Sequence, residues 1–197
     1  EWMHKPANIN VADYQDELLA LSKHVLKDFD NLPDMSFKPV WEHLAEFCPK
    51  LLAKVDEWGL SNRLGESALI ILSNGGKYEI HRDFPMWKIR NIALNIPVLN
   101  CDETYTVFYD AKFPNEHKMP TVGDTIYARH SEVVEEDTAV EIDRCPSNRA
   151  NWINVYQPHA PLSTHNLPRI MFSIRFKPEL FDYIESGYFD QHMVKHD

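Results

Sequence analysis

The chain has 197 residues, of which 44% are hydrophobic and 25% charged, values typical of a soluble globular protein with one substantial core. Its thirty acidic and twenty basic side chains give a formal charge of −10, which argues against nucleic acid or an anionic membrane surface as the main partner. Three cysteines without C-x-x-C spacing predict neither a disulfide framework nor a zinc knuckle and fit a reducing, cytoplasmic compartment, and no apolar run is long enough to span a membrane.

The first 65 residues are expected to form a helical support. Apolar residues recur at spacings of three and four over residues 11–29 and again over 39–58, which predicts two amphipathic helices that pack on a core. Gly59 provides a stop for the second helix, and Pro49 predicts a break or a new first turn inside it.

Residues 66–177 change to an extended pattern. Short apolar or alternating runs predict strands at residues 68–72, 77–83, 90–98, 104–109, 125–128, 151–156 and 169–176. The acidic residues 132–143 indicate an exposed edge segment, with a hairpin around Glu136 and Asp137. Residues 178–197 are expected to form a short helix and a tail.

Two helices followed by about eight short strands predict a mainly β fold with helical support. The specific prediction is a double-stranded β-helix, the cupin-like jelly roll, in which the N-terminal helices pack on one sheet. No repeat or linker interrupts residues 1–197, so one domain is expected.

Two side chains that can bind metal lie at the end of the predicted strand 77–83. Positions i and i+2 of a strand point to the same side, so His81 and Asp83 can bind one ion together. A further histidine would complete a set of two histidines and one carboxylate, which is diagnostic of non-haem Fe(II) oxygenases. In a chain with ten histidines the pair alone is weak evidence, and a solvated strand end is the default interpretation until other residues displace it.

Two later histidines can supply the third ligand. His159 lies ten positions before Arg169, and His165 lies ten positions before Arg175, so the spacing leaves both pairs open. We favour His159, because it follows a clear predicted strand.

This combination of residues resembles the Fe(II)- and 2-oxoglutarate-dependent oxygenases over residues 68–180. The nearest pattern is that of the aspartyl/asparaginyl β-hydroxylase-like branch and of small phage or marine-bacterial relatives. In that branch an arginine follows the first metal histidine by nine positions, as Arg90 follows His81, and another follows the distal histidine by ten, as Arg169 follows His159. The aspartyl hydroxylases lack the metal carboxylate that Asp83 provides here, so no particular substrate is implied.

The resemblance implies an enzyme that couples oxidative decarboxylation of 2-oxoglutarate, to succinate and CO2, with hydroxylation of a substrate. Arg169 would bind the distal carboxylate of the cosubstrate, because a guanidinium can donate two charge-assisted hydrogen bonds to it, and Arg90 and Ser173 would add contacts. Arg175 is the alternative anchor, which would go with His165 as the third ligand. The substrate is expected to be a small molecule or a protein side chain. The implied Fe(II) ligands and catalytic residues are His81, Asp83 and His159.

Two other classes compete with the oxygenase. A cupin-like binding module would keep the fold and bind another metal, or none, but has no reason to place Arg90 and Arg169 beside the ion. A zinc hydrolase is the weaker alternative, since the one carboxylate is needed as a ligand and no general base remains.

Overall fold

The computed structural model describes residues 2–73, 76–83, 92–120, 131–176 and 180–197. The predicted strand at 125–128 and the candidate residue Arg90 lie outside these ranges. Within them, no helix is long and apolar enough to cross a membrane.

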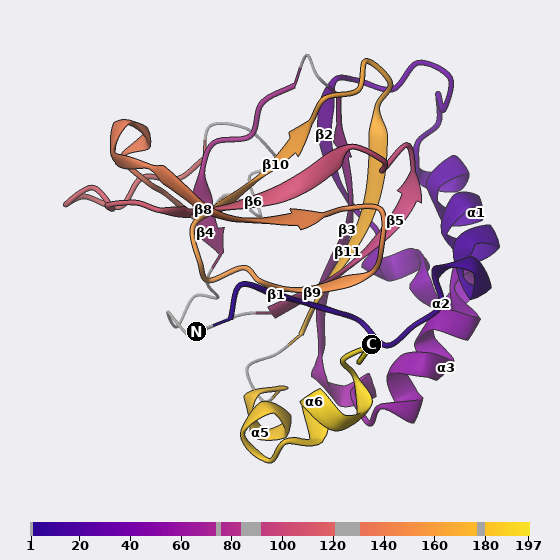
Figure 1. The fold of residues 1–197 in the computed structure, drawn as a ribbon. Helices are drawn as coiled ribbons and strands as arrows, with labels where there is room; N and C mark the ends of the chain where they lie inside the picture. Colours follow the sequence, from indigo (N-terminus) through magenta and orange to yellow (C-terminus); the bar gives the residue numbers. More distant parts are fainter. Residues whose placement is uncertain (1, 74–75, 84–91, 121–130, 177–179) are drawn as a thin grey trace.

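Two antiparallel sheets face each other (Figure 1). The larger contains, in order, β1 (His4–Pro6), β9 (Asn151–Asn154), β5 (Ile92–Leu99), β11 (Arg169–Phe176), β3 (Leu64–Leu72) and β2 (Met35–Pro39). The smaller contains β7 (Ser131–Val133), β4 (His81–Asp83), β10 (His159–Ser163), β6 (Thr104–Asp110) and β8 (Val140–Pro146). From β3 to β6 and from β8 to β11 successive named strands change sheets, which is the connectivity of a jelly roll and confirms the predicted fold class.

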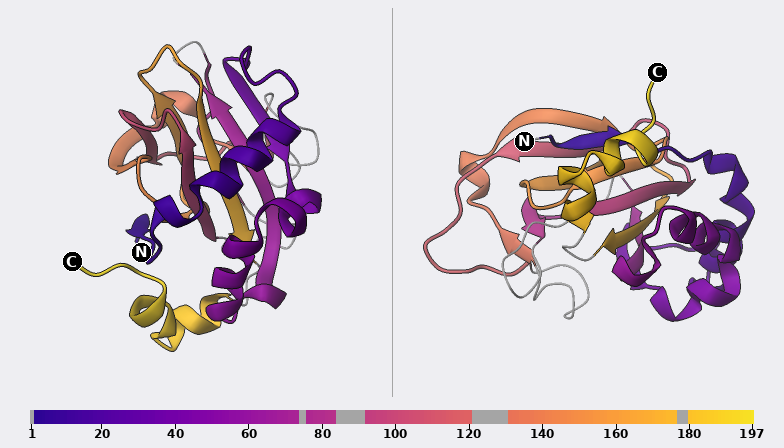
Figure 2. Two further views of the ribbon diagram at one scale, coloured as in Figure 1. Left: turned by 90° about the vertical axis from the view of Figure 1, so that its right-hand side faces the viewer. Right: turned by 90° about the horizontal axis from the view of Figure 1, so that it is seen from below.

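The N-terminal helices cover the outer face of the larger sheet (Figures 1 and 2). They are α1 (Gln15–Val25), preceded by a 3-10 turn at Val11–Asp13, and then α2 (Leu44–Phe47) and α3 (Pro49–Glu57), preceded by a second at Trp41–His43. Pro49 begins α3, a position where its missing N–H leaves no helical hydrogen bond unmade, so the predicted break is confirmed. Two further helices, α5 (Leu180–Glu185) and α6 (Tyr188–His192), follow the last strand.

The main hydrophobic core lies between these helices and the larger sheet. Leu18 of α1 and Leu51 of α3 belong to the same buried cluster as Ile71 of β3 and Phe172 of β11. Because side chains alternate along a strand, the other face of β11 points toward the smaller sheet. That face carries Arg169, Met171, Ser173 and Arg175.

Several local predictions were wrong or incomplete. Strands β1 and β2 lie in the segment expected to be helical support only, and β10 was not predicted as a strand. The hairpin around Glu136 and Asp137 is wrong, because β7 pairs with β4 and β8 pairs with β6, at opposite edges of the smaller sheet. A 3-10 turn at Glu136–Thr138 lies between them. The predicted strand at 77–83 is reduced to His81–Asp83.

Candidate metal centre

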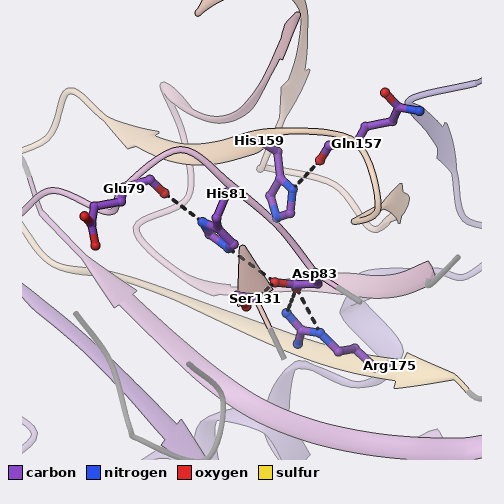
Figure 3. Close-up of polar contacts among 7 residues, drawn as sticks. All are labelled: Glu79, His81, Asp83, Ser131, Gln157, His159 and Arg175. Carbon is purple, nitrogen blue, oxygen red and sulfur yellow. Dashed lines mark hydrogen bonds and ion pairs between the residues drawn. The ribbon is translucent and has the colours of Figure 1, made fainter. Parts of the chain in front are cut away.

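The side chains of His81, Asp83 and His159 meet between the two sheets (Figure 3). Strands β4 and β10 are neighbours, and His81 lies directly opposite His159, so both rings point to the same side. The ring centroids are 4.7 Å apart, and Nε2 of His81 is 3.4 Å from Oδ1 of Asp83. One ligand atom from each residue lies within 4.8 Å of the other two, and no other group of three potential ligands is found in the described part of the chain.

Backbone carbonyls fix the orientation of both imidazoles. Nδ1 of His81 donates to the carbonyl of Glu79 at 2.7 Å, and Nδ1 of His159 donates to the carbonyl of Gln157 at 2.8 Å. Both contacts reach back two residues. Because each Nδ1 carries the proton, each Nε2 is left with a lone pair for a metal ion, the arrangement typical of metal-binding histidines.

Asp83 is held by three other residues. The hydroxyl of Ser131 donates to Oδ1 at 2.8 Å, and the backbone N–H of Asp83 donates to the carbonyl of Val155 at 2.7 Å. Arg175 donates to Oδ2 from Nη2 at 2.5 Å and from Nε at 3.2 Å. The sequence suggested Arg175 only as an alternative cosubstrate anchor and did not single out Ser131, which lies opposite Asp83 in the pairing of β4 with β7.

The charge states of these groups suit metal binding. Burial by itself raises the pKa of Asp83, but Arg175 and His81 outweigh it and hold the pKa well below its ordinary value. Burial lowers the pKa of His159 to about 4, so its ring is neutral at neutral pH. Burial also lowers the pKa of His81, yet the hydrogen bond and charge of Asp83 raise it more, so a metal ion competes with a proton at this histidine.

His165, the alternative third ligand, lies away from the other two. It follows the end of β10, where its backbone N–H donates to the hydroxyl of Ser163 and its Nε2 is 4.0 Å from a carboxylate oxygen of Glu103. The structure therefore brings His159, and not His165, beside His81 and Asp83.

The space between the sheets contains several buried polar side chains. A buried apolar cluster around Phe108 and Ile153 also lies there, as does buried Met171 of β11, whereas a sandwich interior is normally apolar throughout. The buried polar residues there are Thr104 and Thr106 of β6, Ser163 of β10, Asn151 of β9 and Ser173 of β11. Such a polar interior favours a bound polar ligand.

Arg169 is the charged member of this interior. It is 2% exposed, its Nη1 donates to the hydroxyl of Ser147 at 2.9 Å, and its Nε has no hydrogen-bond partner. Burial lowers the pKa of Arg169, and no carboxylate in the described ranges forms an ion pair with it. A buried cation without a counter-charge is costly, so the position favours an anionic ligand.

Fold and site together define a jelly roll with a candidate metal centre and a buried cation between its sheets. Searches found no matching family model and no matching curated protein. Solved structures do match. The epimerase SnoN, in complex with Fe³⁺, alpha-ketoglutarate and nogalamycin RO, is 13% identical over 88% of this chain and 78% of its own, with a TM-score of 0.56.

Two further structures have similar scores. The non-heme alpha-ketoglutarate-dependent carbocyclase SnoK from nogalamycin biosynthesis is 10% identical, with 98% of this chain and 88% of its own covered and a TM-score of 0.53. HygX from Streptomyces hygroscopicus, with nickel and 2-oxoglutarate bound, is 10% identical over 89% and 81% of the two chains, with a TM-score of 0.52. At these identities the likeness establishes the shared fold.

Proposed function

We propose that the protein is an Fe(II)- and 2-oxoglutarate-dependent oxygenase, which couples oxidative decarboxylation of 2-oxoglutarate, to succinate and CO2, with oxidation of a substrate. The observation that carries this proposal is the meeting of His81, Asp83 and His159, with one ligand atom from each within 4.8 Å of the others. The structures of SnoN and HygX, which share the fold, hold a metal ion and this cosubstrate and so support the proposal.

The donor set fits Fe(II). Two imidazoles and one carboxylate leave three positions open on an octahedral ion, enough for a chelating cosubstrate and oxygen. When bound, iron and 2-oxoglutarate supply the redox chemistry, and the protein supplies orientation and a site shielded from water. Phe108, whose ring centroid is 6.3 Å from that of His159, contributes an apolar wall.

Arg169 fits the distal carboxylate of 2-oxoglutarate. It lies on the face of β11 that points toward the smaller sheet, and its unpartnered Nε is available for a carboxylate oxygen. Ser173 is buried on the same face and can donate a further hydrogen bond. Arg90, which we propose as a second contact to the cosubstrate, lies outside the described ranges.

The finer proposal is that the reaction is a hydroxylation, as in the aspartyl/asparaginyl β-hydroxylase-like branch. Its support is the spacing of Arg90 after His81 and of Arg169 after His159. We propose a small molecule or a protein side chain as the substrate, and the formal charge of −10 disfavours nucleic acid.

Uncoupled turnover tests the activity before the substrate is known. The protein with Fe(II) and 2-oxoglutarate is expected to form succinate slowly, at a rate that depends on added iron, and the His81→Ala variant is expected to form none. If no succinate forms above a metal-free control, with or without candidate substrates, the protein belongs to the class of non-catalytic binding modules.

A further inference from the structure

The two oxygens of the Asp83 carboxylate have different surroundings (Figure 3). Oδ1 accepts the hydrogen bond from Ser131 at 2.8 Å and lies 3.4 Å from Nε2 of His81. Oδ2 instead accepts two hydrogen bonds from Arg175, at 2.5 Å from Nη2 and 3.2 Å from Nε. One oxygen therefore lies beside the candidate metal ligands, and the other is bound by a guanidinium.

The contact between Arg175 and Asp83 is firmly supported by the fold. The side chains of Arg175 and Asp83 are 14% and 7% exposed, so water competes little for their hydrogen bonds. Strand β11 is paired on both sides, with β3 and with β5, and Arg175 lies opposite Ala93 in a regular part of its pairing with β5. This pairing fixes the backbone from which the side chain of Arg175 reaches Asp83.

We propose that Arg175 is a positioning residue that restricts Asp83 to binding the metal through one oxygen. The inference rests on the proposed function. A carboxylate can bind a metal through one or both oxygens, and the choice follows from what else its oxygens contact. Since two N–H groups of Arg175 donate to Oδ2, only Oδ1 would remain to bind the ion.

The way Asp83 binds decides how many coordination positions of the metal ion remain open. With Asp83 bound through one oxygen, three of six positions stay open, two for the chelating cosubstrate and one for oxygen. With both oxygens bound, only two stay open, and the cosubstrate fills them. Arg175 would thus preserve an open position for oxygen by restricting how Asp83 binds.

Counting the water ligands of bound Mn(II) tests this directly, because ¹⁷O-labelled water broadens the Mn(II) EPR lines in proportion to the number of bound waters. Without cosubstrate, we expect three waters on the unmodified protein and two on Arg175→Met, in which Oδ2 is free to bind. The matched control is Arg82→Met, which removes an arginine of the same strand as Asp83 that instead donates to Glu132 at 2.7 and 3.0 Å. This control is expected to keep three waters.

Each outcome decides between the claims. Two waters on the unmodified protein, or three on a folded Arg175→Met variant, overturn the role of Arg175 and leave the metal centre and succinate formation intact. Failure of the unmodified protein to bind Mn(II) overturns the proposed function and this inference together. If Arg175→Met does not fold, Arg175→Gln is measured instead, and the same loss of one water is expected because its amide cannot contact Oδ2 from two directions.

Discussion

Replacing Arg169 by methionine should separate cosubstrate affinity from protein stability. Arg169 is 2% exposed, and its side chain donates a hydrogen bond to Ser147. Loss of a charge-assisted contact to a buried carboxylate costs on the order of 2–4 kcal/mol. The affinity for 2-oxoglutarate should therefore fall roughly thirty- to a thousand-fold.

The free energy of unfolding of the metal-free Arg169→Met protein should increase or stay the same. Methionine is of comparable length and apolar, so the variant no longer buries a cation without a carboxylate partner. We expect the variant to unfold at a urea concentration equal to or above that of the unmodified protein.

Isothermal titration of 2-oxoglutarate into the Mn(II)-loaded protein measures the affinity. The matched control is Arg144→Met, which removes an exposed arginine that donates to Glu141 at 2.8 and 2.9 Å, and it should leave the affinity unchanged. Unchanged affinity in a folded Arg169→Met variant would refute the role of Arg169 as the cosubstrate anchor.

Three further predictions follow from the same site. His159→Ala should lose Mn(II) binding in EPR titrations while His165→Ala keeps it, and the reverse ranking would make His165 the ligand. The free energy of unfolding of the metal-free protein should fall by on the order of 3 kcal/mol as the pH falls from about 6.5 toward 4. In this range His159 binds a proton in the unfolded chain but not in the folded protein, where its pKa is about 4. The free energy of unfolding, measured with urea at a series of pH values, should fall by this amount less in His159→Gln than in the unmodified protein. Equal losses in both proteins would contradict the prediction. Mn(II) affinity should rise with pH through the raised pKa of His81, because the metal displaces a proton there, and an affinity that is constant from pH 6 to 8 would disprove that competition.

Local patterns were sufficient to predict the elements that carry most of the site. The spacing in His81-x-Asp83 places both side chains on one side of β4, and the alternation in residues 169–176 predicted β11 with the bounds found. Pro49 likewise marked the start of α3, because proline is compatible with the first helical position and not with a helix interior.

The remaining features depend on contacts between distant segments. Strand β10 contains Pro161, and a proline within a run argues against a strand in sequence-based prediction. The pairing of β10 with β4 places His159, and not His165, beside His81. Strand β1 is three residues long and exists through pairing with β9, nearly 150 residues later. The contacts of Ser131 and Arg175 with Asp83 come from the pairing of β7 with β4 and from the place of β11 between β3 and β5, for which no sequence pattern is diagnostic.

Anaerobic addition of Fe(II) and then 2-oxoglutarate tests the central claim most directly. Chelation of the iron by the cosubstrate should produce a weak visible metal-to-ligand charge-transfer band in the unmodified protein and in His165→Ala, and none in His159→Ala. If Fe(II) and 2-oxoglutarate both bind to the unmodified protein and no band appears, the cosubstrate does not chelate the metal, and the protein is not the oxygenase proposed.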